Sequence, residues 1–104
     1  MKYVGFYEMD QDDKYKVFEL DDKIGAEQEK DPEKWHKKYG KCLGAYFLGM
    51  ESKGMAMFEF DEPMQMINME RVFWPYKRWK FVPLLDVEMV KESYKKSKEE
   101  QTSN

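Results

Sequence analysis

The strongest candidate for a chemical role is Glu59, a carboxylate near the end of a short apolar run that also contains Met55 and Met57. In a strand, alternate side chains share a face, so these three residues are expected to line one side of a sheet. A carboxylate partly removed from water among thioethers would have a raised pKa and would be suited to act as a base. The alternative is an ordinary acid at a strand end, in water or paired with Lys80 or Arg78.

Three tyrosines are candidates to line the same space as Glu59. Tyr3, Tyr7 and Tyr46 all fall in predicted strands, and each offers an aromatic ring and a hydroxyl that needs a partner. We therefore predict a ligand-binding set on one sheet face. Its members are Tyr3, Tyr7, Tyr46, Met55, Met57 and Glu59. The alternative is that the tyrosines are plain strand residues with hydrated tips.

The remaining chemistry-bearing side chains are sparse. Cys42 is the only cysteine and His36 the only histidine. One cysteine makes no intrachain disulfide, and one of each falls short of a zinc ligand set. We expect no metal and no cofactor, and the roles of Cys42 and His36 are left open. Asn68, within an apolar helix, is predicted to satisfy a backbone group.

The local patterns predict four strands and several helices that would position these residues. The strands are predicted at residues 2–9, 45–50, 55–60 and 79–85. Helices are predicted from Lys14, with Val17, Leu20 and Ile24 as one apolar stripe, and from Pro32 to Tyr39. Further helices are predicted over 62–74 and from Asp86. Asp31-Pro32 is typical of a helix start, and Gly40 of a helix end. Pro83 has no N–H to donate, which predicts an edge strand.

This order of elements predicts an α+β fold of the ferredoxin-like type. Its plan is β-α-β-β-α-β, with a four-stranded antiparallel sheet and an extra C-terminal helix. We expect one domain over residues 1–96 and a disordered tail over 97–104. The strands are apolar on both sides, so one sheet face is left uncovered by helices, and a second copy of the chain is its expected partner.

Composition narrows the possible partners. The chain has 104 residues and a net charge of -3, from 18 Lys and Arg against 21 Asp and Glu. This balance argues against nucleic-acid binding. No apolar run approaches the ~18 residues of a membrane span, and the N-terminus does not read as a signal peptide. We expect a cytoplasmic protein that binds neither nucleic acid nor membrane.

The chain resembles the dimeric α/β-barrel superfamily, specifically its small uncharacterised single-domain families. The resemblance covers roughly residues 1–90 and rests on KYVGFYEMD, YFLGMESKGMAMFEFDEP, MQMINMERVFWPY and KFVPLLD. It implies a dimer whose two sheets close around a central space. Some members of that superfamily degrade haem with a histidine on or near the second helix, but this chain has no histidine after His36.

The function expected from these observations is binding of a small apolar or aromatic ligand between the paired sheets of a homodimer. The alternative is a cofactor-free enzyme of the monooxygenase or isomerase type, as the resemblance implies. No nucleophile–base pair, metal set or phosphate loop is recognisable in the sequence, so the residues alone leave catalysis undecided.

Overall fold

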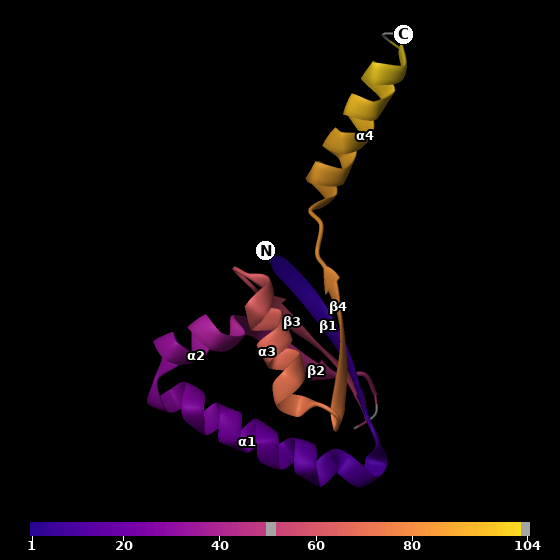
Figure 1. Ribbon diagram of the computed structural model, residues 1–104. Helices are drawn as coiled ribbons and strands as arrows, with labels where there is room; N and C mark the ends of the chain where they lie inside the picture. The colour runs from indigo at the N-terminus through magenta and orange to yellow at the C-terminus, as the bar shows by residue number, and fades with distance from the viewer. Residues whose placement is uncertain (50–51, 103–104) are drawn as a thin grey trace.

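The computed structural model describes residues 1–49 and 52–102. The elements, in chain order, are β1 (Lys2–Met9), a 3₁₀ turn (Gln11–Asp13), α1 (Lys14–Lys30), α2 (Pro32–Tyr39), β2 (Lys41–Phe47), β3 (Lys53–Glu59), α3 (Pro63–Phe73), β4 (Lys77–Pro83) and α4 (Val87–Thr102). The strands form one four-stranded sheet in the order β2-β3-β1-β4. Every neighbouring pair is antiparallel, which confirms the predicted α+β class with an antiparallel sheet (Figure 1).

The predicted signals for α2 are confirmed in detail. The Asp31 side chain accepts a hydrogen bond from the Lys34 backbone N–H at 3.2 Å, and Pro32 occupies the first turn. Gly40 ends the helix with φ of 75°, a left-handed conformation that glycine adopts without a Cβ clash. The chain therefore turns directly from α2 into the edge strand β2.

Two amides hold α3 against α2. The Gln65 side chain takes part in a capping box with Glu62, and its Nε2 donates to the backbone oxygen of His36 at 3.1 Å. The Asn68 amide donates to the backbone oxygen of Lys38 at 3.0 Å, as predicted for a residue that satisfies a backbone group. These bonds saturate carbonyls at the end of α2, so α2 and α3 are fixed as a pair.

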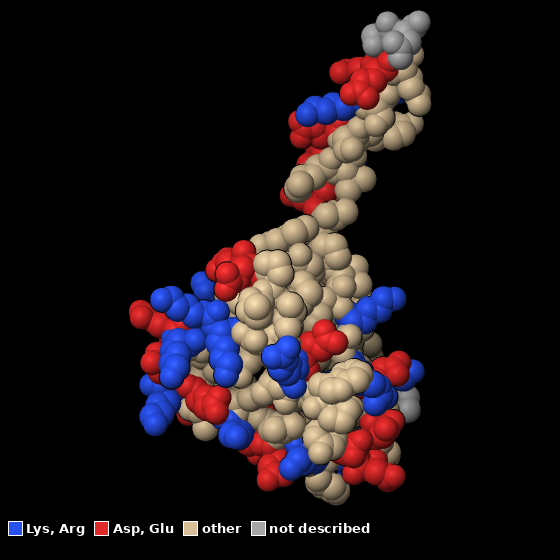
Figure 2. Space-filling view, in the orientation of Figure 1, with Lys and Arg blue, Asp and Glu red and all other residues tan. Residues whose placement is uncertain are grey.

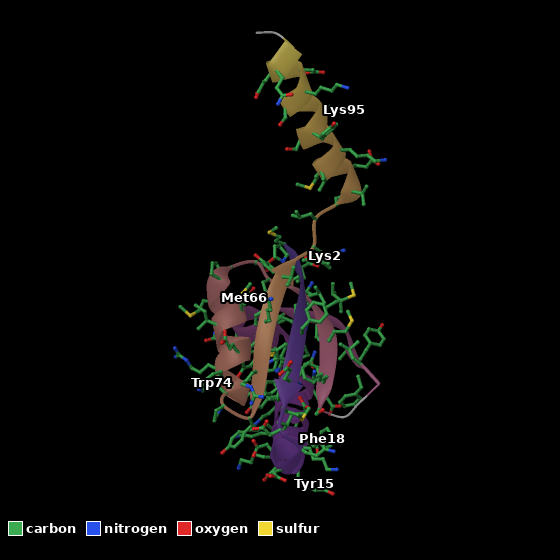
Figure 3. The ribbon with its side chains drawn as sticks, turned by 90° about the vertical axis from the view of Figure 1, so that its right-hand side faces the viewer. Lys2, Tyr15, Phe18, Met66, Trp74 and Lys95 are labelled. Carbon is green, nitrogen blue, oxygen red and sulfur yellow. The ribbon has the colours of Figure 1, made fainter. Side chains whose placement is uncertain are left out.

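Strand alternation places the core on one face of the sheet, beneath α3 (Figure 3). Phe58 from β3 and Tyr7 from β1 lie among buried side chains of the helices, including Val17, Met69 and Phe73. The remaining members of the buried core are Met9, Ile24, Trp35, Tyr39, Ala56 and Phe60. The predicted apolar stripe of α1, which includes Val17 and Ile24, faces this core.

Among the described residues 1–49 and 52–102, no helix lies on the opposite face of the sheet (Figure 3). Cross-strand register aligns Val4 with Met57 and Val82, and Phe6 with Met55 and Lys80. The resulting surface, here called the open face, comprises Lys2, Val4, Phe6, Lys41, Tyr46, Met55, Met57, Glu59, Arg78, Lys80 and Val82. Phe6 and Tyr46 expose 41% and 60% of their surface, so a substantial apolar area remains in water.

Several element boundaries differ from the sequence-based expectation. β2 begins at Lys41, four residues before the predicted start at 45, and the register shift between Cys42 and Gly44 disrupts its alternation. β4 spans 77–83 instead of 79–85, although its Pro83 does lie in an edge strand. Part of the predicted turn at 51–54 and the predicted end of a strand at Met50 fall outside the described residues, whereas Lys53 and Gly54 belong to β3.

The C-terminal helix α4 projects away from the sheet and the other helices (Figure 1). It continues to Thr102, so residues 97–102, where the sequence predicts a disordered tail, are helical. Val87, Val90 and Tyr94 are exposed and lie three and four residues apart, which puts them on one side of the helix.

Candidate functional site

A cavity of about 290 Å³ lies between the helix-facing side of the sheet and the surrounding helices. Its lining residues are Tyr7, Asp21, Ile24, Trp35, Cys42, Ala45, Tyr46, Phe47, Ala56, Phe58, Met69, Phe73, Lys77 and Trp79. The volume is at the lower end of the range of small-molecule sites, and the mostly apolar wall with a few polar groups is typical of them. In the same orientation as Figure 1, Lys and Arg side chains gather over α2, at the left of the view, and mostly uncharged side chains cover the upper part of α3 (Figure 2).

The most unusual group in this cavity is Lys77, which is only 7% exposed. Alternation in β4 puts it on the helix-facing side, together with Trp79 and Phe81. Its Nζ lies 4.2 Å from the ring centroid of Tyr7, 4.4 Å from that of Phe73 and 4.8 Å from that of Trp79. An ammonium within about 6 Å of a ring centroid is attracted by the ring quadrupole, so the three rings form a cage for the cation.

The nearest counter-charge is Asp21 of α1, whose Oδ1 is 3.9 Å from the Lys77 Nζ. This separation is an ion pair but is too long for a hydrogen bond. Burial lowers the pKa of Lys77. The negative charge of Asp21 and, to a smaller extent, Cys42 act in the opposite direction and raise it. Burial likewise raises the pKa of Asp21, opposed by Lys77 and assisted by Asp22. Both shifts reduce the cost of moving a proton from Lys77 to Asp21.

The phenol of Tyr7 is fixed by a close approach to Gly54. Tyr7 and Gly54 pair across β1 and β3, and a Cβ at position 54 would clash with the Tyr7 hydroxyl. Burial raises the pKa of Tyr7, and the charge of Asp21 adds to this. The hydroxyl therefore remains protonated at neutral pH and is available as a hydrogen-bond donor.

Two further donors lack acceptors. Within the part of the chain that the structure describes, the indole N–H groups of Trp35 and Trp79 are buried without a hydrogen-bond partner. Both residues line the cavity. A buried N–H without a partner costs about 1–3 kcal/mol, so a bound molecule that supplies acceptor oxygens would be stabilised here.

The predicted ligand-binding residues divide between the two faces. Met55, Met57 and Glu59 share the open face with Tyr46, which also contributes to the cavity wall. The other two tyrosines point the other way: Tyr7 lines the cavity, and the Tyr3 ring packs against Phe60 at 5.6 Å. They do not share a face with Glu59 because β1 pairs with β3 in a register that sets Tyr3 opposite Phe58.

Glu59 has different neighbours from those predicted. It lies between Lys2 of β1 and Lys41 of β2, its cross-strand partners on the open face. Arg78 and Lys80 belong to β4, which pairs with β1 and not with β3. Opposite charges directly across a sheet are mildly stabilising. The two lysines therefore give Glu59 a structural role in the pairing of the strands.

Of the residues that form the cage, Tyr7 was predicted from the sequence as a ligand-binding residue. Lys77, Phe73 and Trp79 were not, although a signal was present. The segment Trp74-Pro75-Tyr76-Lys77-Arg78-Trp79 mixes aromatic and basic residues. Because the last strand was predicted to begin at residue 79, Lys77 lay outside it. Read as a strand from 77, the segment places Lys77 in phase with Trp79 and Phe81, a cation on an aromatic face. Asp21 carries no comparable signal, because its helix is polar on most sides.

His36 and Cys42 belong to different elements. His36 belongs to α2, where its ring lies against Trp35 at 5.9 Å, and Cys42 is an exposed thiol on β2. In residues 1–49 and 52–102, no three His, Cys, Asp or Glu side chains are grouped as a metal ion would need. No helix of the described chain is both long and apolar enough to cross a membrane.

No protein-family model, curated protein or solved structure matches this chain.

The stability of the wild type relative to Lys77→Met is expected to rise as the pH increases toward 10.5. Burial places the folded-state pKa of Lys77 below its ordinary value of 10.5, so the folded protein releases this proton before the unfolded chain does. The cost of burying the ammonium is present in full below the folded-state pKa and is gone above 10.5.

Urea unfolding of both proteins from neutral to alkaline pH measures this difference, and titrations common to the two proteins cancel. A stability difference that stays flat or falls with rising pH would contradict the assigned burial of the charge.

Proposed function

We propose that this protein binds a small aromatic carboxylate, or a similar planar anion, in the cavity around Lys77. The observation that carries the proposal is a buried ammonium in an aromatic cage whose nearest carboxylate oxygen is 3.9 Å away. A ligand oxygen at about 2.8 Å would make the charge-assisted hydrogen bond that Asp21 does not make.

The other groups around the cavity support the same ligand class. The indoles of Trp35 and Trp79 and the phenol of Tyr7 are donors, and the walls are aromatic or aliphatic. Aromatic rings pack favourably edge to face against such walls. The proposal keeps the small aromatic ligand expected from the sequence but places it on the helix-facing side of the sheet and not between two sheets.

Benzoate is the direct probe, with benzyl alcohol as its uncharged counterpart. Calorimetric titration of the wild type is expected to show at least about tenfold tighter binding of benzoate, since a hydrogen bond to a charged group contributes about 1.5–3 kcal/mol. Lys77→Met keeps the length and apolar character of the side chain but removes the charge, so this preference should disappear.

Lys80→Met is the matched control, because Lys80 lies on the same strand but on the open face. It should bind benzoate as the wild type does. A wild type that does not prefer benzoate over benzyl alcohol, or equal losses in the two variants, would show that Lys77 is only a structural cation.

We also propose that the fold is ferredoxin-like. Support comes from the strand order β2-β3-β1-β4 and from the placement of α1 and α3 between strands that are not consecutive in the sheet. The relevant consequence is a sheet covered by helices on one face alone, which leaves the open face for a partner.

We further propose a homodimer in which two open faces pack against each other. Phe6, at the middle of β1, is 41% exposed although its strand is flanked on both sides. A two-fold axis pairs identical patches and covers both at once. Opposed Lys2 and Glu59 groups give the patch both charge signs, as self-complementary packing requires.

Sedimentation at micromolar concentration is expected to give twice the chain mass of 12.7 kDa. Phe6→Lys should shift the protein to monomer, because it buries two unpaired charges at the interface. Tyr15→Lys, at a helix position that is 75% exposed, is the control and should leave the mass unchanged. A wild-type monomer at that concentration would refute the dimer.

A further inference from the structure

Lys77 has a second chemical capacity besides its charge: it is a primary amine enclosed in an apolar site. Among the described residues that line the cavity, it carries the only amine. Its Nζ is surrounded by the rings of Tyr7, Phe73 and Trp79 within 4.8 Å, and a carboxylate lies 3.9 Å away. Lysines that form imines with carbonyl compounds are activated in such desolvated surroundings.

We propose that Lys77 forms an imine with a small aromatic aldehyde that enters the cavity. The inference rests on the proposed function, because the aldehyde must occupy the same aromatic site as the carboxylate. It deepens that function by naming a covalent step and the carbonyl class that would undergo it.

The step balances with the groups present. Asp21 accepts a proton from the Lys77 ammonium, and the freed amine lone pair attacks the carbonyl carbon. A C–N bond forms as the carbonyl π bond breaks, and the carbonyl oxygen takes a proton from the nitrogen to become a hydroxyl. The hydroxyl then receives the Asp21 proton and leaves as water, while the nitrogen lone pair forms the C=N bond. The net change is ammonium plus aldehyde to protonated imine plus water, and no oxidant or reductant takes part.

The surroundings favour each part of this step. Burial lowers the pKa of Lys77 and raises that of Asp21, so proton transfer between them is easier than in water. The indole N–H groups of Trp35 and Trp79 are donors without an acceptor and can stabilise the oxygen of the bound carbonyl. The three rings exclude water from the nitrogen, which disfavours hydrolysis of the product.

The test is reductive trapping with benzaldehyde and cyanoborohydride at neutral pH, followed by peptide mass mapping of the full chain. Lys77 should be labelled at least about tenfold faster than Lys80, the open-face lysine of the same strand, and faster than the exposed Lys91 of α4, which lies outside the proposed dimer interface. Asp21→Asn should slow labelling of Lys77 on the order of a hundredfold and shift its pH profile, without changing Lys80. Asp21→Glu should restore a large part of the rate.

Benzoate separates this inference from the function on which it rests. Added benzoate should protect Lys77 and leave Lys80 unaffected. If benzoate binds but Lys77 is labelled no faster than Lys80, the imine is refuted and the carboxylate site stands. If benzoate does not bind and Lys77 shows no preference, both proposals are refuted.

Discussion

Replacing Phe58 with alanine is expected to lower the free energy of unfolding by about 3–5 kcal/mol. Phe58 is 2% exposed and lies on β3, one of the two inner strands. Its ring stacks on Phe60 at 5.2 Å and meets Trp79 and Phe81 edge to face at 5.4 and 5.9 Å. Truncation removes these contacts and leaves a hole that a β-sheet backbone cannot close by shifting.

Thermal and urea unfolding measure this loss. A chain of this size loses roughly 4–8 °C in melting temperature for each kcal/mol, so the variant should be largely unfolded at temperatures where the wild type is folded. Tyr15→Ala removes a ring that is 75% exposed and should change stability by about 0.5 kcal/mol or less. Similar losses in the two variants would mean that the ring cluster around Phe58 is not the core.

Gly54→Ala is expected to destabilise the protein by about 1–3 kcal/mol and to disrupt the lysine cage. A Cβ at this position would occupy the place of the Tyr7 hydroxyl and would lie 2.6 Å from the backbone oxygen of Tyr46. Neither obstacle yields easily, because one belongs to a buried ring over Lys77 and the other to the neighbouring strand. Displacing Tyr7 removes one wall of the cage, so benzoate binding should weaken along with stability.

Gly25→Ala is the control for Gly54→Ala, because it adds the same methyl group at a position where the added Cβ has room. Position 25 is inside α1, and apart from the adjacent backbone of α1 itself no atom of the described residues lies within 4 Å of a Cβ there. Alanine is the better helix former by about 0.5–1 kcal/mol, so this variant should be more stable than the wild type. Opposite signs for the two variants support the close approach of Tyr7 to Gly54. A neutral Gly54→Ala would show that Tyr7 lies elsewhere.

Local signals alone were enough to predict several elements. The first strand, residues 2–9, and the short helix from Pro32 to Tyr39 were predicted at their observed bounds. In the helix, Asp31 caps the first turn and Gly40 adopts positive φ, so the chemistry that starts and stops it lies within the segment itself. The apolar stripe of α1 likewise identified Val17 and Ile24 as core residues.

Strand ends were less predictable, because they depend on the partner strand. β4 begins at Lys77 because that residue pairs with Met9 of β1, a contact between distant parts of the chain. β2 begins at Lys41 because Lys41 pairs with Glu59, and its alternation is broken by the register shift after Cys42. No property of either segment taken alone sets these positions.

The sequence by itself determined the α+β class with an antiparallel sheet and the alternation that gives Met55, Met57 and Glu59 one face. The tertiary structure alone decided which face each tyrosine joins and which charges meet. The strand register set Tyr7 opposite Gly54. The packing of α1 brought Asp21 within 3.9 Å of Lys77, although the two residues are 56 positions apart in the sequence (77 − 21 = 56). Such a site is a product of long-range pairing, since burial and charge proximity arise only when separate elements come together.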